Sequence, residues 1–170
     1  AALIFFVALG MSGGTTLADG NFLEVMGTSF LPYAYFGIAG LMAVVTPLIM
    51  LAMGKIAIRP LLLLMLLCSG GIFALTGLLP ISWFATKVIA DTIFFVILAA
   101  LWNFIDQSYD MQDAKRHYGL YSAVLICGFA AGSSTISLLI DALGSRGLLW
   151  LLATDFTLAA SIVVLIIRTT

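Results

Sequence analysis

Six long apolar segments, separated by short polar or proline-containing stretches, make up most of this sequence of 170 residues. Each is about as long as the roughly 20 residues that an α-helix needs to cross a bilayer. Only 9% of the residues are charged, whereas a soluble domain has about 25%. The pattern predicts an all-α membrane protein, with one domain of six transmembrane helices over residues 1–170. The expected helices are 1–17, 31–52, 61–79, 83–104, 118–139 and 148–167.

Lysine and arginine predict the orientation, because short cytoplasmic loops are enriched in both. Successive loops lie on alternate sides of the membrane. One side then has two basic residues, Lys87 and Arg146, and it also has Asp19 and Glu24 in or near the first loop. The other side has Lys55, Arg59, Lys115, Arg116 and Arg168. We therefore expect an integral membrane protein with both termini in the cytoplasm. The membrane that we expect is the inner (plasma) membrane of a bacterium.

Several classes of function find no support in the sequence. It has no nucleophile, metal or phosphate-loop motif of the common enzyme families, and its one histidine, His117, is predicted in a loop. Cys68 and Cys127 lie in apolar segments without the spacing of a zinc site. We expect no enzyme activity and no cofactor or metal, and the net charge of -1 gives no reason to expect a nucleic acid partner.

Three ionisable residues fall inside the predicted spans, where a charge costs several kcal/mol and usually faces a partner or a wet cavity. Asp155 is near the middle of the sixth segment, and Lys87 and Asp91 are one turn apart in the fourth. They are either neutralised groups that fix helix packing or parts of a solute or proton site at the membrane midplane.

Small residues mark places where helices can approach closely. Gly128 and Gly132 form a GxxxG motif in the fifth segment, which predicts close packing or a contact that moves during a conformational cycle. Two glycines and two threonines weaken the helix expected over 8–16. Either this stretch exposes backbone polar groups at membrane depth, or it is a helix end before a turn at 19–21.

The junction between the fourth and fifth segments resembles a known family. Leu101-Trp102-Asn103-Phe104 is followed by Asp113-Ala114-Lys115-Arg116-His117-Tyr118-Gly119-Leu120. Together with the runs at 17–24 and 31–33, this is similar to the ATP/ADP translocases of bacteria and plastids, which are related to the major facilitator superfamily. The resemblance implies the amino-terminal six-helix half of a transporter, a major-facilitator-like half bundle.

The ionisable residues inside the spans, together with polar residues of the matching runs, give a set of candidate site residues. The solute-binding candidates are Asp19, Asn21, Lys87, Asp91, Asn103 and Asp155. Asp106, Asp113, Lys115 and Arg116 are candidates for a gate, or for residues that only anchor the cytoplasmic boundary. The family commonly has basic residues around the acidic residue that ends the first helix, where this chain has Ala18 and Gly20.

Three functions follow as hypotheses. The first is a secondary transporter that moves a nucleotide such as ATP or ADP, or another small polar anion, by alternating access. The second is a proton-coupled facilitator for an unrelated solute, and the third is a membrane anchor or sensor for a soluble domain. A carrier with six spans needs a second six-helix half, in the same chain or in a homodimer partner, within the lipid bilayer.

Overall fold

The computed structural model describes the backbone of residues 1–108 and 111–169, and all their side chains except those of 108, 111–116 and 169. The elements are α1 (Ala2–Met26), the short 3-10 helix η1 (Thr28–Phe30), α2 (Leu31–Met53), α3 (Ile58–Leu78), α4 (Trp83–Ser108) and α5 (Met111–Thr169). No strand occurs among the described residues, and five helices are long and apolar enough to cross a membrane. The prediction of an all-α membrane protein is confirmed at this level.

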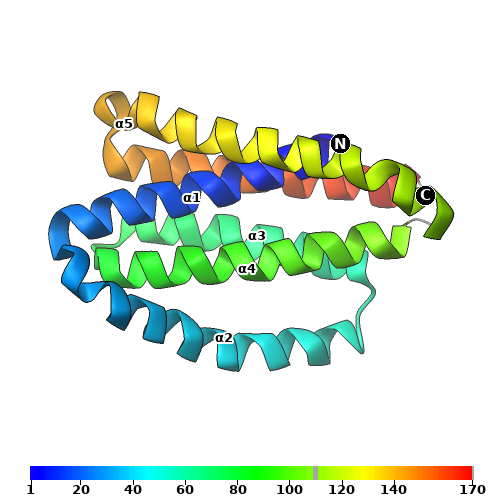
Figure 1. Ribbon diagram of the computed structural model, residues 1–170, viewed down its shortest axis with the longest axis horizontal. Coiled ribbons are helices and arrows are strands. Elements are labelled where there is room, and N and C mark those ends of the chain that lie inside the picture. Colours follow the sequence, from blue (N-terminus) through cyan, green and yellow to red (C-terminus); the bar gives the residue numbers. More distant parts are fainter. Residues whose placement is uncertain (109–110, 170) are drawn as a thin grey trace.

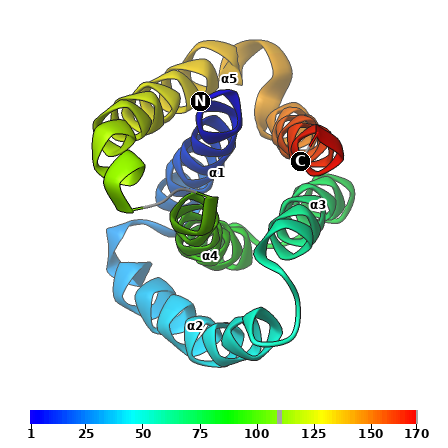
Figure 2. The ribbon, with the colours of Figure 1, turned by 90° about the vertical axis from the view of Figure 1, so that its right-hand side faces the viewer.

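The helix α5 consists of two arms that meet at Gly144. This glycine has φ 66° and ψ 170°, in the left-handed half of backbone space that favours glycine. Figures 1 and 2 show that the chain reverses there, so that the arms 111–143 and 145–169 run in opposite directions.

The helix α1 is the centre of the bundle. It lies between the two arms of α5 and beside α4 (Figure 2), and its residues Val7, Ala8 and Phe22 are completely buried. The second arm of α5 packs against α3 through the stacked rings of Phe73 and Phe156, whose centroids are 5.6 Å apart. In contrast, α2 lies at the edge and packs mainly on α4 (Figure 1).

The expected end of the first helix, at residue 17, is wrong. Asp19 lies well inside the helix, and Glu24 lies in its last turn, near the loop as expected. The helix continues through Gly13 and Gly14 to Met26, and the chain turns at Gly27, where φ is 76°. Tertiary packing outweighs the low helix propensity of these residues, because Gly13 lies against Leu152 and Gly14 against Phe73. The residues 8–16 are therefore regular helix.

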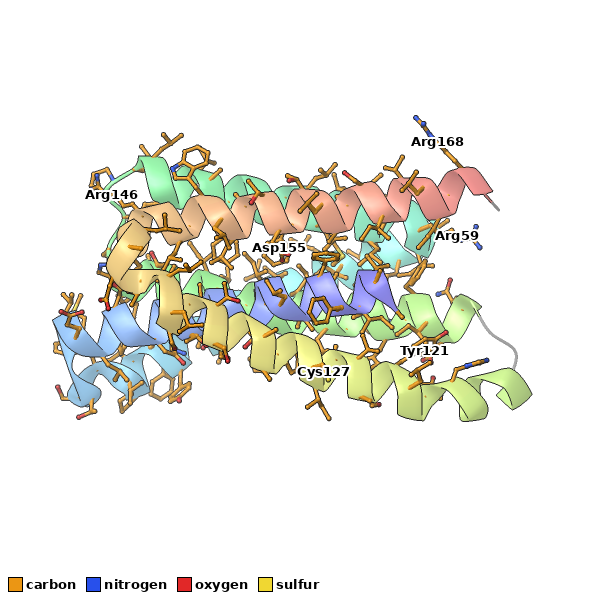
Figure 3. The ribbon with its side chains drawn as sticks, turned by 90° about the horizontal axis from the view of Figure 1, so that it is seen from above. Arg59, Tyr121, Cys127, Arg146, Asp155 and Arg168 are labelled. Carbon is orange, nitrogen blue, oxygen red and sulfur yellow. The ribbon has the colours of Figure 1, made fainter. Side chains whose placement is uncertain are left out.

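The basic residues separate as expected, with one exception. Arg59 and Arg168 lie at one end of the bundle and Arg146 lies at the other (Figure 3). Lys87, which was counted with Arg146 on the outer side, lies inside α4 as its place in the fourth segment predicted, and only 5% of it is exposed. The side chains of Lys115 and Arg116 lie outside the described residues.

The GxxxG motif of α5 packs against the backbone of α1. A Cβ atom on Gly128 would come within 2.7 Å of the Phe5 carbonyl oxygen, and one on Gly132 would collide with the Leu9 carbonyl oxygen. The absence of side chains at these two positions lets the helix axes approach closely. The packing role predicted for this motif agrees with the structure.

We expect Gly128→Ala to destabilise the bundle by about 1–3 kcal/mol, the usual cost of overpacking. Gly119→Ala is the matched control, because it lies in the same arm and has open space around its Cβ position. Thermal unfolding in detergent should show a lower midpoint for Gly128→Ala and an unchanged or higher one for Gly119→Ala. Equal midpoints would contradict the close contact.

Candidate functional site

A buried lysine connects two helices through two carboxylates. Lys87 lies one turn after the start of α4, and its Nζ atom donates to Asp91 Oδ2, one turn further along, at 2.6 Å. The same Nζ atom forms an ion pair with Asp19 Oδ1 on α1. The pairing of Lys87 with Asp91 was predicted from their spacing, whereas the link to Asp19 was not. We call these three residues the charge network.

The two carboxylates differ in their access to the surroundings. The side chains of Lys87 and Asp91 are 6% and 13% exposed, but that of Asp19 is 48% exposed. A cation in a low-dielectric interior is retained only when it is paired and hydrogen bonded. The network has a formal charge of -1, and Asp19 is its most exposed member.

An aromatic pair lies next to the network. Phe22 follows Asp19 by three residues on α1, and Phe84 precedes Lys87 by three on α4. Their ring centroids are 6.2 Å apart. Residues three apart in a helix lie on the same face. The two rings therefore lie beside the network, toward the end of the bundle where α1 ends and α4 begins.

Hydroxyl groups connect α1 to the first arm of α5. Ser12 and Ser133 share a hydrogen bond of 2.6 Å, Ser12 also donates to the Phe129 carbonyl at 2.8 Å, and Thr16 donates to Ser133 at 3.3 Å. The sequence analysis missed this cluster, although Ser12 and Ser133 each adjoin the small residues that mark the close contact. Hydroxyl bonds of this type hold membrane helices together.

The candidate Asn21 takes part in a separate contact. It donates to the Leu17 carbonyl at 2.8 Å and accepts a hydrogen bond from Ser145 at 2.7 Å. With Glu24 and Ser137, it lines a cavity of about 280 Å³ between α1 and α5. Asn21 thus ties the end of α1 to the start of the second arm of α5.

Asp155 lies in the interior of the bundle, near the middle of the second arm (Figure 3). It is 5% exposed, and its carboxylate faces the Gly10 backbone, where a Cβ atom would collide with Oδ2. Among the described residues, Oδ2 has no hydrogen-bond partner. An unpaired carboxylate oxygen at this depth is unusual for a purely structural group.

The remaining candidates lie elsewhere. Asn103 is exposed and its Nδ2 atom is 3.9 Å from Met53 Sδ. Asp106 accepts a hydrogen bond from Tyr118, whose ring stacks on Trp102 with centroids 5.7 Å apart. The side chains of the other gate candidates, Asp113, Lys115 and Arg116, lie outside the described residues.

The structure does not gather all six solute-binding candidates in one place. Helix geometry separates Gly10, beside Asp155, from Asp19 by about 13 Å along α1, and Asn103 from Lys87 by about 24 Å along α4. The charge network is therefore the one cluster that brings three of the predicted residues together. Comparisons with known protein families, characterised proteins and solved structures gave no match.

We expect Lys87→Met to destabilise the protein by about 3–5 kcal/mol, because it leaves two carboxylates without their shared cation. Adding Asp91→Asn to this variant removes one of those charges and should restore part of the loss, so that the two effects are not additive. The measurement is thermal unfolding in detergent of Lys87→Met, Asp91→Asn and the double variant, each against wild type. Arg146→Met is the control, because it also removes one positive charge, but from an exposed side chain. Additive losses from the Lys87 and Asp91 substitutions would contradict the network.

Proposed function

We propose that this chain is one half of a secondary carrier, which moves a nucleotide or another small polar anion across the membrane by alternating access. The observation that supports this most directly is Lys87, a buried cation whose counter-charges come from two helices, α1 and α4. Charged groups inside membrane helices are costly, and they commonly mark the pathway of a solute or an ion.

Six spans are part of the proposal. The apolar stretch His117–Arg168 has 52 residues, and as one straight helix it would be about 78 Å long, against a hydrocarbon core of about 30 Å. Counting each arm of α5 as a span would give six, with both termini toward the same end of the bundle (Figure 1), the end that holds Arg59 and Arg168 (Figure 3). By the distribution of basic residues, that end is the cytoplasmic one.

The charge network suggests how an anion would bind. The ammonium group of a lysine acts as a compact point charge for phosphate or carboxylate oxygens. The half-exposed Asp19 is the counter-charge that an arriving anion would replace, while Asp91 keeps its contact with Lys87 along the same helix. Binding of the solute would thus replace the ion pair between Asp19 of α1 and Lys87 of α4 by an ion pair between the solute and Lys87.

This exchange gives a reason for a conformational change. A ligand shifts an equilibrium between two conformations only if it makes different contacts in them. Loss of the Asp19 contact removes the ionic link between α1 and α4, while the close contact of α1 with α5 remains. A second half, in the same chain or in a second copy, would complete the cavity around the network, as the resemblance implies.

The test is exchange of labelled nucleotide by the full-length protein in reconstituted vesicles. Lys87→Gln should abolish exchange, while Arg146→Gln, which removes an exposed cation from the same end of the bundle, should leave it unchanged. Absence of exchange with every nucleotide at saturating concentration would exclude nucleotide specificity. Equal transport of small anions by wild type and Lys87→Gln would exclude the network as the site.

Asp155 favours a second candidate, a proton-coupled facilitator. Its unpartnered Oδ2 atom, buried against Gly10, is a group that could accept a proton without breaking an ion pair. In this case Asp155→Asn should uncouple uptake from an imposed pH gradient while solute binding persists. Unchanged coupling in this variant, measured with a pH dye in the vesicles, would remove Asp155 from consideration.

A further inference from the structure

An apolar groove runs between α2, α3 and α4, away from the charge network. It has a volume of about 400 Å³. Leu41, Val45 and Ile49 line it from α2, and Met65 and Ile72 are among the residues that line it from α3. Figure 2 shows α2 and α3 on either side of α4, joined by a loop at the end that faces the viewer.

Apart from the weakly polar thiol of Cys68, the groove presents no free polar group to a ligand. Two hydroxyl residues line it, but Ser69 donates to the Met65 carbonyl at 2.8 Å and Thr92 to the Val88 carbonyl at 2.7 Å. Both bonds stay within the residue's own helix. An occupant of the groove must therefore be a hydrocarbon.

The groove exists because α2 approaches α4 closely at one point and then separates from it. A Cβ atom on Gly37 would be 3.0 Å from Val88 Cγ2, whereas one on Gly40, a turn later, would meet nothing within 4 Å. The groove-lining residues of α2 all follow this point. At its end α2 meets α4 again, where Met53 Sδ is 3.9 Å from Asn103 Nδ2. The groove therefore lies between these two contacts, and the α2–α3 loop follows directly after the second.

Two cations lie at that end. Arg59 precedes Met65 by six residues on α3, about 9 Å along the helix, and Lys55 lies in the loop, exposed. The backbone amides of Gly54, Lys55 and Ile56 are bonded to carbonyls of α2. Within the part of the chain that the structure describes, neither cation pairs with a carboxylate.

We propose that this groove binds one acyl chain of an anionic phospholipid, whose headgroup phosphate contacts Lys55 and Arg59. The hydrocarbon lining accounts for the chain and the two cations for the phosphate. Basic groups beside a gap between membrane helices, on the side predicted to be cytoplasmic, are a common arrangement for anionic lipids. The site is independent of the carrier proposal, since it shares no residue with the charge network.

The test is native mass spectrometry of the full-length protein, purified in detergent and mixed with phosphatidylglycerol or phosphatidylcholine. Wild type should retain phosphatidylglycerol preferentially, and Lys55→Gln and Arg59→Gln should each weaken its retention by about fivefold. Arg146→Gln, at the opposite end, should have no effect. Equal retention of both lipids by wild type would overturn the proposal, as would displacement of the lipid by soluble glycerol phosphate.

The two cysteines allow a second test that does not depend on charge. Cys68 lines the groove, while Cys127 is exposed on α5, away from it (Figure 3). In the Cys127→Ser protein, a bulky maleimide on Cys68 should fill the groove and reduce phosphatidylglycerol retention several-fold. The same label on Cys127 in the Cys68→Ser protein should not. If the Cys68 label leaves retention unchanged, the groove is not the site.

Discussion

The close approach of α1 to the first arm of α5 is the contact on which the rest of the bundle depends. In lipid, the hydrophobic effect does not draw helices together, so packing and hydrogen bonds must do so. Here Gly128 and Gly132 admit the α1 backbone, and Ser12 bonds to Ser133. This contact positions α1 so that its Gly10 faces Asp155 and its Asp19 pairs with Lys87.

The bundle holds its buried charges in two different ways. Lys87 has two counter-charges, one from its own helix and one from α1, so that it stabilises the contact between two helices. Asp155 has the Gly10 backbone and apolar neighbours, with one oxygen unpartnered. In the first arrangement every charge has a partner of opposite sign, whereas in the second a carboxylate lies in the interior without one.

The sequence predicted the apolar helices and the local pair of Lys87 and Asp91, because both depend on spacing along one helix. It did not predict the ion pair with Asp19 or the bond between Ser12 and Ser133, since these join residues 68 and 121 positions apart, and such contacts depend on how the helices pack. Local propensity misplaced the end of α1 for the same reason. The glycines at 13 and 14 break an isolated helix, but here they fit against Leu152 and Phe73.

Gly144 has a mechanical consequence for the second half of the chain. It is the one described residue of α5 whose backbone angles are non-helical, and one residue spans at most about 3.6 Å. The two arms thus have no slack between them and cannot slide past each other by a helical turn of about 5.4 Å. Relative motion of the arms is confined to a change in the angle between them at Gly144. The hydrogen bond from Ser145 to Asn21 links this hinge to α1.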